Sequence, residues 1–361
     1  MSTMPSTPIT DGFYMPGEFA PHERCWMLWP ERPDVWRNTA KPAQDAFAEV
    51  ARAIGRFEPV TMGVSAEQYD RARAMLPPEV ELLVLDYNDA WARDNGPTFV
   101  INRGGELRGV DWDFNAWGGL YQDYRADDAL ARKILAHFGA GRYKAPLVME
   151  GGAIDVDGEG TLIVTEQCLL NPNRNPNLSK TQIESHLRAY LNVQKVIWLQ
   201  NGVFNDETDG HVDNLCCFVR PGVVALTWTD DQSDPQYAIS LAAYEQLSRE
   251  RDARGRPLHV QPIHQPTPMF MTPEEATGLQ PAPGSWPRPA HQRLAGTYIN
   301  YYVANGGVIA PQFDDAHDKA ALETIQALFP EREVIGVYAR EILLGGGNIH
   351  CITQQQPVSD Q

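Results

Sequence analysis

Apolar residues recur along the chain at two spacings, and the longer spacing predicts amphipathic helices. Positions 47, 50, 51 and 54 are apolar at the i, i+3, i+4, i+7 spacing of one helix face, and Pro42 suits the first turn of that helix. The segment Ser179-Lys180-Thr181-Gln182 has the form of a capping box, which begins a helix. On these grounds we expect helices at 42–57, 123–138, 179–191, 236–250 and 318–329.

Shorter apolar runs, many of them bounded by glycine-rich or acidic turns, predict strands. The expected strands are 25–29, 80–85, 98–101, 107–112, 147–149, 153–155, 162–165, 196–199, 217–219, 223–228, 258–262, 298–303, 308–311 and 333–337. Most of them come in pairs that precede a helix, and a further strand follows the helix.

This order of elements repeats along the chain. Strands broken by a turn, then a helix, then another strand recur five times at intervals of roughly 55 to 80 residues, a period typical of propellers and other repeat folds. The units share no obvious sequence, so an ordinary mixed α/β fold is the alternative. We interpret residues 1–361 as a single catalytic domain, with 1–12 as a loosely ordered tail and 273–291 as a long proline-rich loop that is functional or mobile.

Composition narrows the class of protein. The net charge of −17 argues against nucleic-acid binding and favours cationic partners. No apolar run reaches the roughly 18 residues that a membrane helix needs, and the N-terminus lacks a signal-peptide pattern. Five cysteines, at 25, 168, 216, 217 and 351, are an odd number without a CxxC pair, which indicates a reducing compartment. We therefore expect a cytoplasmic protein.

The stretch Gly345-Gly346-Gly347 lies shortly before Cys351, near the C-terminal end of the chain. Consecutive glycines let another group approach the backbone closely, at an entropic cost to folding. We expect Cys351 to lie in an apolar, strand-like setting facing the same place. An inert buried cysteine after a glycine turn is the alternative, because free cysteines usually act as small apolar residues.

Polar residues follow three of the predicted strands where each strand meets a turn. They are Asp94 within Trp91–Pro97, Glu150 before Gly151-Gly152, and the pair His211 and Asp213, which point to one face if that segment is extended. Each has a structural explanation of its own, as a turn or core residue. A purely structural explanation is harder to accept for all four residues together, because carboxylates at the ends of buried strands need partners.

A thiol beside an imidazole suggests nucleophilic catalysis. Carboxylates around a thiolate would oppose its ionisation unless a cation binds among them. A guanidinium ion is such a cation, because it stays protonated and its planar fork matches paired carboxylates. The residues therefore predict a guanidino substrate, with Gly346 leaving room for the flat group beside Cys351.

A metal site is the alternative from a different class of protein. Residues 155–159 resemble the start of a calcium loop but lack its later ligands, so we interpret them as a hairpin turn. His211, Asp213 and Cys351 could ligate zinc, yet no second histidine follows at helical spacing. We therefore consider a metal-dependent hydrolase a weaker interpretation than an enzyme with a cysteine nucleophile.

These motifs resemble the agmatine deiminases of the guanidine-modifying (pentein) superfamily, to which peptidyl-arginine deiminases are related. The resemblance covers nearly the whole chain. Its segments are 12–16, 27–32, 91–97, 114–119, 150–152, 210–218 and 345–357.

The resemblance implies a five-bladed pseudosymmetric α/β propeller of ββαβ units, with the active site at its axis and neither metal nor cofactor. It implies hydrolysis of agmatine to N-carbamoylputrescine and ammonia, on the route from arginine to putrescine and the polyamines. It also implies a homodimer or a higher homo-oligomer.

Carried onto this chain, the resemblance assigns a role to each site residue. Cys351 is the nucleophile that forms an amidino-cysteine, and His211 protonates the leaving ammonia and then activates water. Asp94 and Asp213 bind the guanidinium nitrogens, Glu150 supports the group alongside His211, and Trp91 packs near the substrate.

A deiminase of arginine or peptidyl-arginine remains the second interpretation. Free arginine carries a carboxylate that needs a basic partner, whereas agmatine ends in an ammonium that needs acidic or aromatic groups. The acidic loop 206–209 is a candidate ammonium site, and it favours agmatine.

Overall fold

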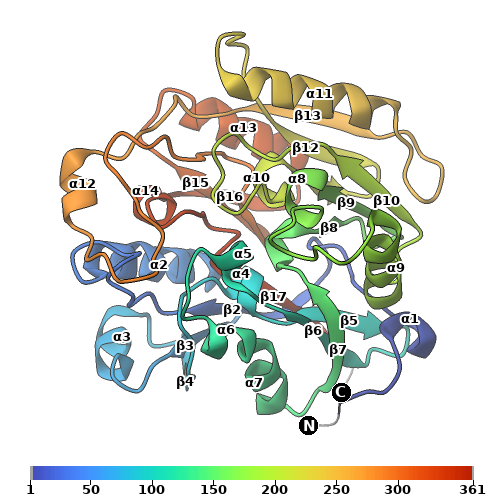
Figure 1. The fold of residues 1–361 in the computed structure, drawn as a ribbon, viewed down its shortest axis with the longest axis horizontal. Coiled ribbons are helices and arrows are strands. Elements are labelled where there is room, and N and C mark those ends of the chain that lie inside the picture. Colours follow the sequence, from blue (N-terminus) through green and yellow to red (C-terminus); the bar gives the residue numbers. More distant parts are fainter. Residues whose placement is uncertain (1–2, 360–361) are drawn as a thin grey trace.

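The structure is a computed structural model that describes residues 3–359, and its strands form five separate sheets (Figure 1). Two sheets have four strands, in the orders β1-β5-β6-β7 and β17-β2-β3-β4. Three have three strands, in the orders β10-β9-β8, β11-β12-β13 and β14-β15-β16. The chain therefore has a mixed α/β fold with several small sheets.

The strands have the following bounds: β1 Phe13–Tyr14, β2 His22–Leu28, β3 Val60–Val64, β4 Glu81–Val84, β5 Thr98–Asn102, β6 Leu107–Asp113, β7 Gly141–Val148, β8 Asp155–Val156, β9 Thr161–Thr165, β10 Lys195–Leu199, β11 Cys216–Arg220, β12 Val223–Trp228, β13 His259–His264, β14 Tyr302–Ala304, β15 Gly307–Gln312, β16 Glu333–Tyr338 and β17 Thr353–Pro357.

The helices have the following bounds: α1 Pro8–Asp11, α2 Lys41–Ile54, α3 Tyr69–Met75, α4 Ala92–Asn95, α5 Ala116–Gly119, α6 Arg125–Asp128, α7 Leu130–His137, α8 Glu166–Leu169, α9 Lys180–Leu191, α10 Val212–Leu215, α11 Pro235–Arg249, α12 Pro273–Thr277, α13 Asp318–Leu328 and α14 Arg340–Leu343, with a 3-10 turn η1 at Gly151–Ala153.

Each sheet contains the same unit. An antiparallel strand pair is followed by a helical segment, and a third strand then pairs in parallel with the second strand, as in β11-β12-α11-β13 and β14-β15-α13-β16. The repeated order expected from the sequence is thus present. In the fifth sheet the unit is split, because β17 near the C-terminus pairs antiparallel with β2. The sequence analysis had missed β17 and β3.

The longer helices follow their sequence patterns. In α9, Ser179 and Gln182 exchange both hydrogen bonds of a capping box, as predicted. In α2, Pro42 lies in the first turn, and the side chains of Phe47, Val50 and Ile54 are buried. The helix expected at 123–138 is instead divided into α6 and α7.

Two segments expected to lack structure contain short helices. Pro8–Asp11 of the expected tail forms α1 and lies against α9, while residues 1 and 2 lie outside the described part. The loop 273–291 begins with α12, which the capping box of Thr272 and Glu275 stabilises. The expected tail and the expected loop therefore each include a short helix.

The apolar residues pack into three clusters that hold the sheets and helices together. Trp26, Trp29 and Trp36 of the largest cluster are almost fully buried. In Figure 1, helices α7, α9 and α11 lie at the periphery, and the short helices α4 and α10 lie nearer the middle. Among residues 3–359, none of the helices has the length and apolar character needed to cross a membrane.

Candidate active site

Cys351 lies in a turn between α14 and β17, not in the strand expected from the sequence. Its backbone carbonyl accepts a hydrogen bond from the Arg93 amide at 3.2 Å. The Asn300 side chain contacts it as well, because Nδ2 donates to Sγ at 3.3 Å and Oδ1 accepts from the Cys351 amide at 3.4 Å. The thiol is thus fixed by segments far away in the sequence.

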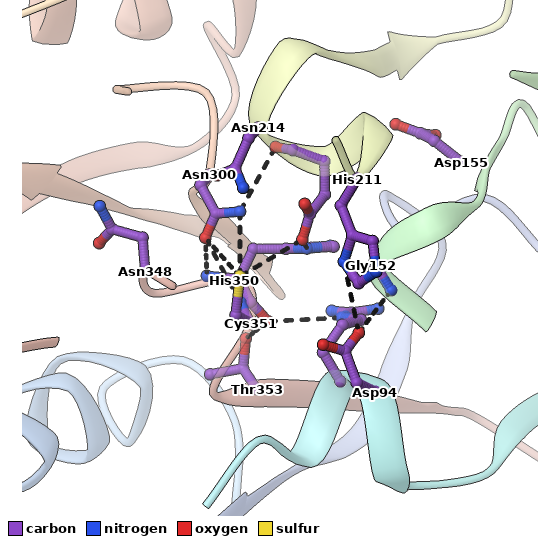
Figure 2. Close-up of polar contacts among 12 residues, drawn as sticks. Asp94, Gly152, Asp155, His211, Asn214, Asn300, Asn348, His350, Cys351 and Thr353 are labelled. Atoms are coloured by element: carbon purple, nitrogen blue, oxygen red, sulfur yellow. Dashed lines mark hydrogen bonds and ion pairs between the residues drawn. The ribbon is translucent and has the colours of Figure 1, made fainter. Parts of the chain in front are cut away.

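Three predicted site residues, Asp94, His211 and Asp213, converge on Gly152. Figure 2 shows Asp94 and His211 beside it. The Gly152 amide donates to Asp94 Oδ1 at 2.8 Å. A Cβ atom at Gly152 would lie 2.6 Å from His211 Nδ1, 2.9 Å from Asp213 Oδ2 and 3.0 Å from Asp94 Oδ1. Only glycine leaves room for this arrangement. His211 is the N-cap of helix α10 and the segment to Asp213 is not extended, so the condition stated for a common face of these two residues is not met.

Asp213 connects the thiol to a chain of buried charges. Its Oδ2 accepts from Cys351 Sγ at 3.5 Å and lies 2.9 Å from His350 Nδ1. His350 Nε2 lies 2.9 Å from both oxygens of Glu18, and Glu18 pairs with Arg93 Nη1 at 2.7 Å. Although burial favours the neutral acid, the interactions with His350 lower the pKa of Asp213. Asp213 is therefore held as a carboxylate.

Glu150 and His211 lie together on the other side of Gly152. Glu150 is fully buried, and its Oε1 accepts from Arg174 Nε at 2.7 Å. Burial opposes ionisation, but Arg174 and His211 together outweigh it and lower the pKa of Glu150 to about 2. Glu150 Oε2 lies 3.7 Å from His211 Nε2. Despite its burial, His211 has a pKa raised well above its usual value, chiefly by Asp94. The imidazole is therefore a proton donor at neutral pH.

The resting thiol of Cys351 is protonated. Burial raises its pKa well above the ordinary value, and the charges of Asp213 and Asp94 raise it further, while hydrogen bonds from Asn348 and Asn300 act in the opposite direction. A cation bound between the two carboxylates would remove the electrostatic part of this shift.

A pocket of about 290 Å³, including its mouth, opens onto this cluster. Its lining consists of Trp91, Asp94, Trp117, Tyr121, Glu207, Thr208, Gly346, Gly347 and Cys351. The indole of Trp117 donates to Asp94 Oδ2 at 2.8 Å, and burial raises the pKa of Asp94 in spite of its contact with His211. The wall thus combines aromatic rings with buried acids.

Gly346 and Gly347 both line the pocket, and each makes a different close contact. A Cβ at Gly347 would lie 2.5 Å from the Trp91 ring and 3.1 Å from Cys351 Sγ. Gly346 lines the pocket with φ +106°, but a Cβ there would collide with Glu207 and not with the thiol. The close approach beside Cys351 therefore depends on Gly347.

The structure describes the residues of both metal sites that were considered from the sequence. Asp157 Oδ1 accepts from the amides of Glu159 and Thr161, as in the predicted hairpin turn between β8 and β9. Among the described residues, the cluster with metal-ligating geometry is Glu150, Cys168 and His211, without Asp213 or Cys351.

The sequence analysis gave no role to several residues that touch the predicted ones or their direct partners: Glu18, Arg93, Trp117, Cys168, Arg174, Asn300 and His350. Two of them had a visible signal, because Arg93 adjoins Asp94 and His350 adjoins Cys351. Asn300 and Arg174 lie far along the chain from their partners, and their roles depend on the fold.

Cys351 and Asp94 line the pocket, and His211, Asp213 and Glu150 contact or lie close to these two residues or each other. A mixed α/β fold with a thiol, an imidazole and three buried carboxylates gathered in this way is typical of a hydrolase that acts on guanidino groups. A model of the Porphyromonas-type peptidyl-arginine deiminase family matches residues 14–357, and the chain belongs to this family.

Curated relatives and a solved structure are similar over the full length. The chain is 58% identical over 363 aligned positions to an agmatine deiminase of Pseudomonas aeruginosa, with 99% of both chains covered. It is 56% identical to one of Pseudomonas syringae pv. tomato, also with 99% of each covered. The structure matches that of the agmatine deiminase of Enterococcus faecalis with a TM-score of 0.97 at 46% identity, covering 99% of this chain and 100% of the other. The resemblance seen in the sequence motifs is confirmed.

Proposed function

We propose that this chain is an agmatine deiminase, which hydrolyses agmatine to N-carbamoylputrescine and ammonia in the formation of putrescine from arginine. The observation that carries the proposal is the position of the Cys351 thiol, 3.5 Å from Asp213 Oδ2 in a pocket that Asp94 also lines. The full-length similarity to agmatine deiminases supports the same substrate.

The guanidinium binds between Asp94 and Asp213. Asp213 Oδ1 is buried and has no hydrogen-bond partner in the described part of the chain, so it is free to accept a guanidinium N–H. The planar fork of a guanidinium suits two carboxylates. Trp91 and Trp117 close the pocket around the flat cation.

Substrate binding activates the nucleophile. The bound cation favours loss of the Cys351 thiol proton to the solvent, and the resulting thiolate attacks the guanidinium carbon and forms a C–S bond. His211 donates a proton to the departing nitrogen as the C–N bond breaks, which releases ammonia and leaves an amidino-cysteine. The neutral His211 then takes a proton from water, the hydroxide attacks the same carbon, and the C–S bond breaks to give the carbamoyl product.

Glu150 supports this cycle without contact to the nucleophile. Its carboxylate lies beside His211 Nε2, and Arg174 keeps it ionised. An ionised neighbour stabilises the imidazolium form of His211 in the first half of the cycle.

The distal ammonium is assigned to Glu207. Of the acidic loop 206–209, Asp206 binds Thr208 and Asn214, and Asp209 binds Arg174. Glu207 is the acid of this loop that lines the pocket. It pairs with Arg288, whose positive charge is the one observation that favours arginine as the substrate.

Ammonia release from agmatine and from arginine, measured side by side, tests the substrate. We expect a strong preference for agmatine, and a preference for arginine would overturn the proposal. We expect Cys351→Ala to abolish turnover and the mass shift of a trapped amidino adduct. Activity that survives in this variant but is removed by chelators would instead support a metal-dependent hydrolase.

We further propose that the five sheets are the blades of a five-bladed pseudosymmetric propeller formed by a single domain, residues 1–361. The common strand order of the sheets and the pairing of β17 with β2 support this. A homo-oligomeric state and a cytoplasmic location remain predictions. All five cysteines are free, which fits a reducing compartment.

A further inference from the structure

Glu150, Cys168 and His211 form a cluster behind the pocket wall. Glu150 lies immediately before η1, Cys168 in α8, and His211 immediately before α10. One ligand atom from each residue lies within 4.8 Å of the other two. The three residues are almost completely buried, with 0%, 0% and 1% of their surface exposed. The fold thus brings carboxylate, thiol and imidazole donors to one point.

Two donors of this cluster lack a hydrogen-bond partner among the described residues. Glu150 Oε2 and His211 Nε2 are buried and make no hydrogen bond within residues 3–359, although they lie only 3.7 Å apart. A buried polar atom without a partner is costly, so such an atom calls for an explanation. Cys168 has no role in the proposed catalytic cycle.

We propose that Glu150, Cys168 and His211 bind one Zn²⁺ ion. Nitrogen, oxygen and sulfur donors together suit zinc, whereas Mg²⁺ and Ca²⁺ need oxygen ligands. The ligand atoms are Glu150 Oε2, Cys168 Sγ and His211 Nε2, and water completes a tetrahedral site. Binding releases the thiol proton of Cys168 and the Nε2 proton of His211 to the solvent, because the thiolate and the neutral imidazole are the ligands.

The surroundings of the cluster are compatible with this site. Arg174 is bonded to Glu150 through Oε1, so Oε2 remains available. The repulsion between Arg174 and the metal is offset by the charges of the carboxylate and the thiolate. The Cys351 thiol contacts Asp213 and Asn300 and is not among the ligands.

Zinc at this site inhibits the enzyme, because it occupies the imidazole that must donate and accept the proton. The inhibition rests on the proposed function, whereas binding of the metal does not. The ion is a reversible inhibitor and takes no part in the reaction.

Titration with Co²⁺ tests the site, because a thiolate ligand gives a near-ultraviolet sulfur-to-cobalt absorption band. We expect one equivalent of Co²⁺ to produce this band in the wild-type protein and in Cys351→Ala. Cys168→Ala should lose the band and bind at least tenfold more weakly, while the matched control Cys216→Ala should bind as the wild type does. In the wild type, Zn²⁺ should displace Co²⁺, suppress ammonia release from agmatine, and be reversed by EDTA.

Two results would overturn the site: no band in the wild-type protein, or a band that is lost in Cys351→Ala. Circular dichroism checks the folding of Cys168→Ala, and His211→Ala provides a second variant that should bind at least tenfold more weakly. Absence of agmatine turnover would overturn the proposed function, and the Co²⁺ titration would still decide the metal site.

Discussion

The imidazole of His350 is linked through Asp213 to the thiol of the proposed nucleophile. Its two ring nitrogens lie 2.9 Å from Asp213 Oδ2 and from the Glu18 carboxylate. Burial and Arg93 disfavour the charged ring, yet Glu18 and Asp213 raise the pKa of His350 to about 9. The imidazolium therefore fixes the orientation of Asp213 and keeps it ionised at neutral pH.

We expect His350→Gln to lower kcat/KM for agmatine roughly 10- to 100-fold, since a hydrogen bond to a charged group contributes about 1.5–3 kcal/mol. The wild type should lose activity as the pH rises past about 9, where the imidazolium deprotonates, and the variant should lack this step. Kinetics across pH, with the exposed His259→Gln as control, measure both effects. An unchanged profile would show that His350 has only a packing role.

At the residue scale, the reactive groups could be identified from the sequence, but the groups that orient them could not. Cys351, His211 and the three carboxylates could be proposed because thiol, imidazole and acids together define a chemistry. Asn300 and Arg174 could not, because an asparagine or arginine far along the chain has no local pattern. The different contacts of Gly346 and Gly347 could not be predicted, since neighbouring glycines cannot be told apart without the backbone path.

At the scale of elements, the proline-rich loop is tied to the active site through Arg288. The guanidinium donates to Glu207 Oε2 at 2.9 Å, to the Leu344 carbonyl at 3.2 Å and to the Tyr121 hydroxyl at 3.1 Å. Arg288 is buried, so the loop 273–291 forms part of the wall beside Gly346.

We expect Arg288→Ala to destabilise the protein by about 3–5 kcal/mol, because it leaves the buried Glu207 carboxylate unpaired. The segment after α12 should then be cleaved faster by proteases, and the KM for agmatine should rise. Limited proteolysis, urea unfolding and kinetics measure these effects. The exposed Arg249→Ala removes a surface pair with Glu245 and should cost no more than about 0.5 kcal/mol. Equal proteolysis of the two variants would contradict the role of Arg288.

Elements with a strong local pattern could be predicted, and those that depend on distant pairing could not. The capping box of α9 and the apolar face of α2 are local signals. Strand β17 is the polar sequence Thr353–Pro357, yet all its residues are buried because it pairs with β2 and lies near β5. Its structure follows from the sheet that joins the two ends of the chain.

At the scale of the whole molecule, Asp127 joins segments that are distant in the sequence. It lies in α6 and accepts hydrogen bonds from the amides of Asn88 at 2.7 Å and Asp89 at 3.2 Å. Asp89 in turn accepts from the indoles of Trp36 and Trp91, each at 2.9 Å. The position of the Trp91 ring in the pocket therefore depends on a carboxyl group outside it.

Asp127 also links stability to pH. Burial, together with the charge of Asp89, raises its pKa from 3.8 to about 8. Between these values the folded protein keeps a proton that the unfolded chain has released. This bound proton adds to the free energy of unfolding. The added stability is fully present below pH 3.8 and falls by about 1.4 kcal/mol per pH unit as the pH rises to about 8.

Asp127→Asn keeps an acceptor oxygen but removes the titration. We expect the stability of this variant relative to the wild type to rise between pH 5 and 8 by about 1.4 kcal/mol per unit, and to level off at higher pH. Urea unfolding at a series of pH values measures the difference, and the exposed Asp70→Asn controls for the lost negative charge. A constant difference across this range would show that the Asp127 carboxyl is already ionised in the folded protein, and that its contacts with residues 88 and 89 do not depend on a bound proton.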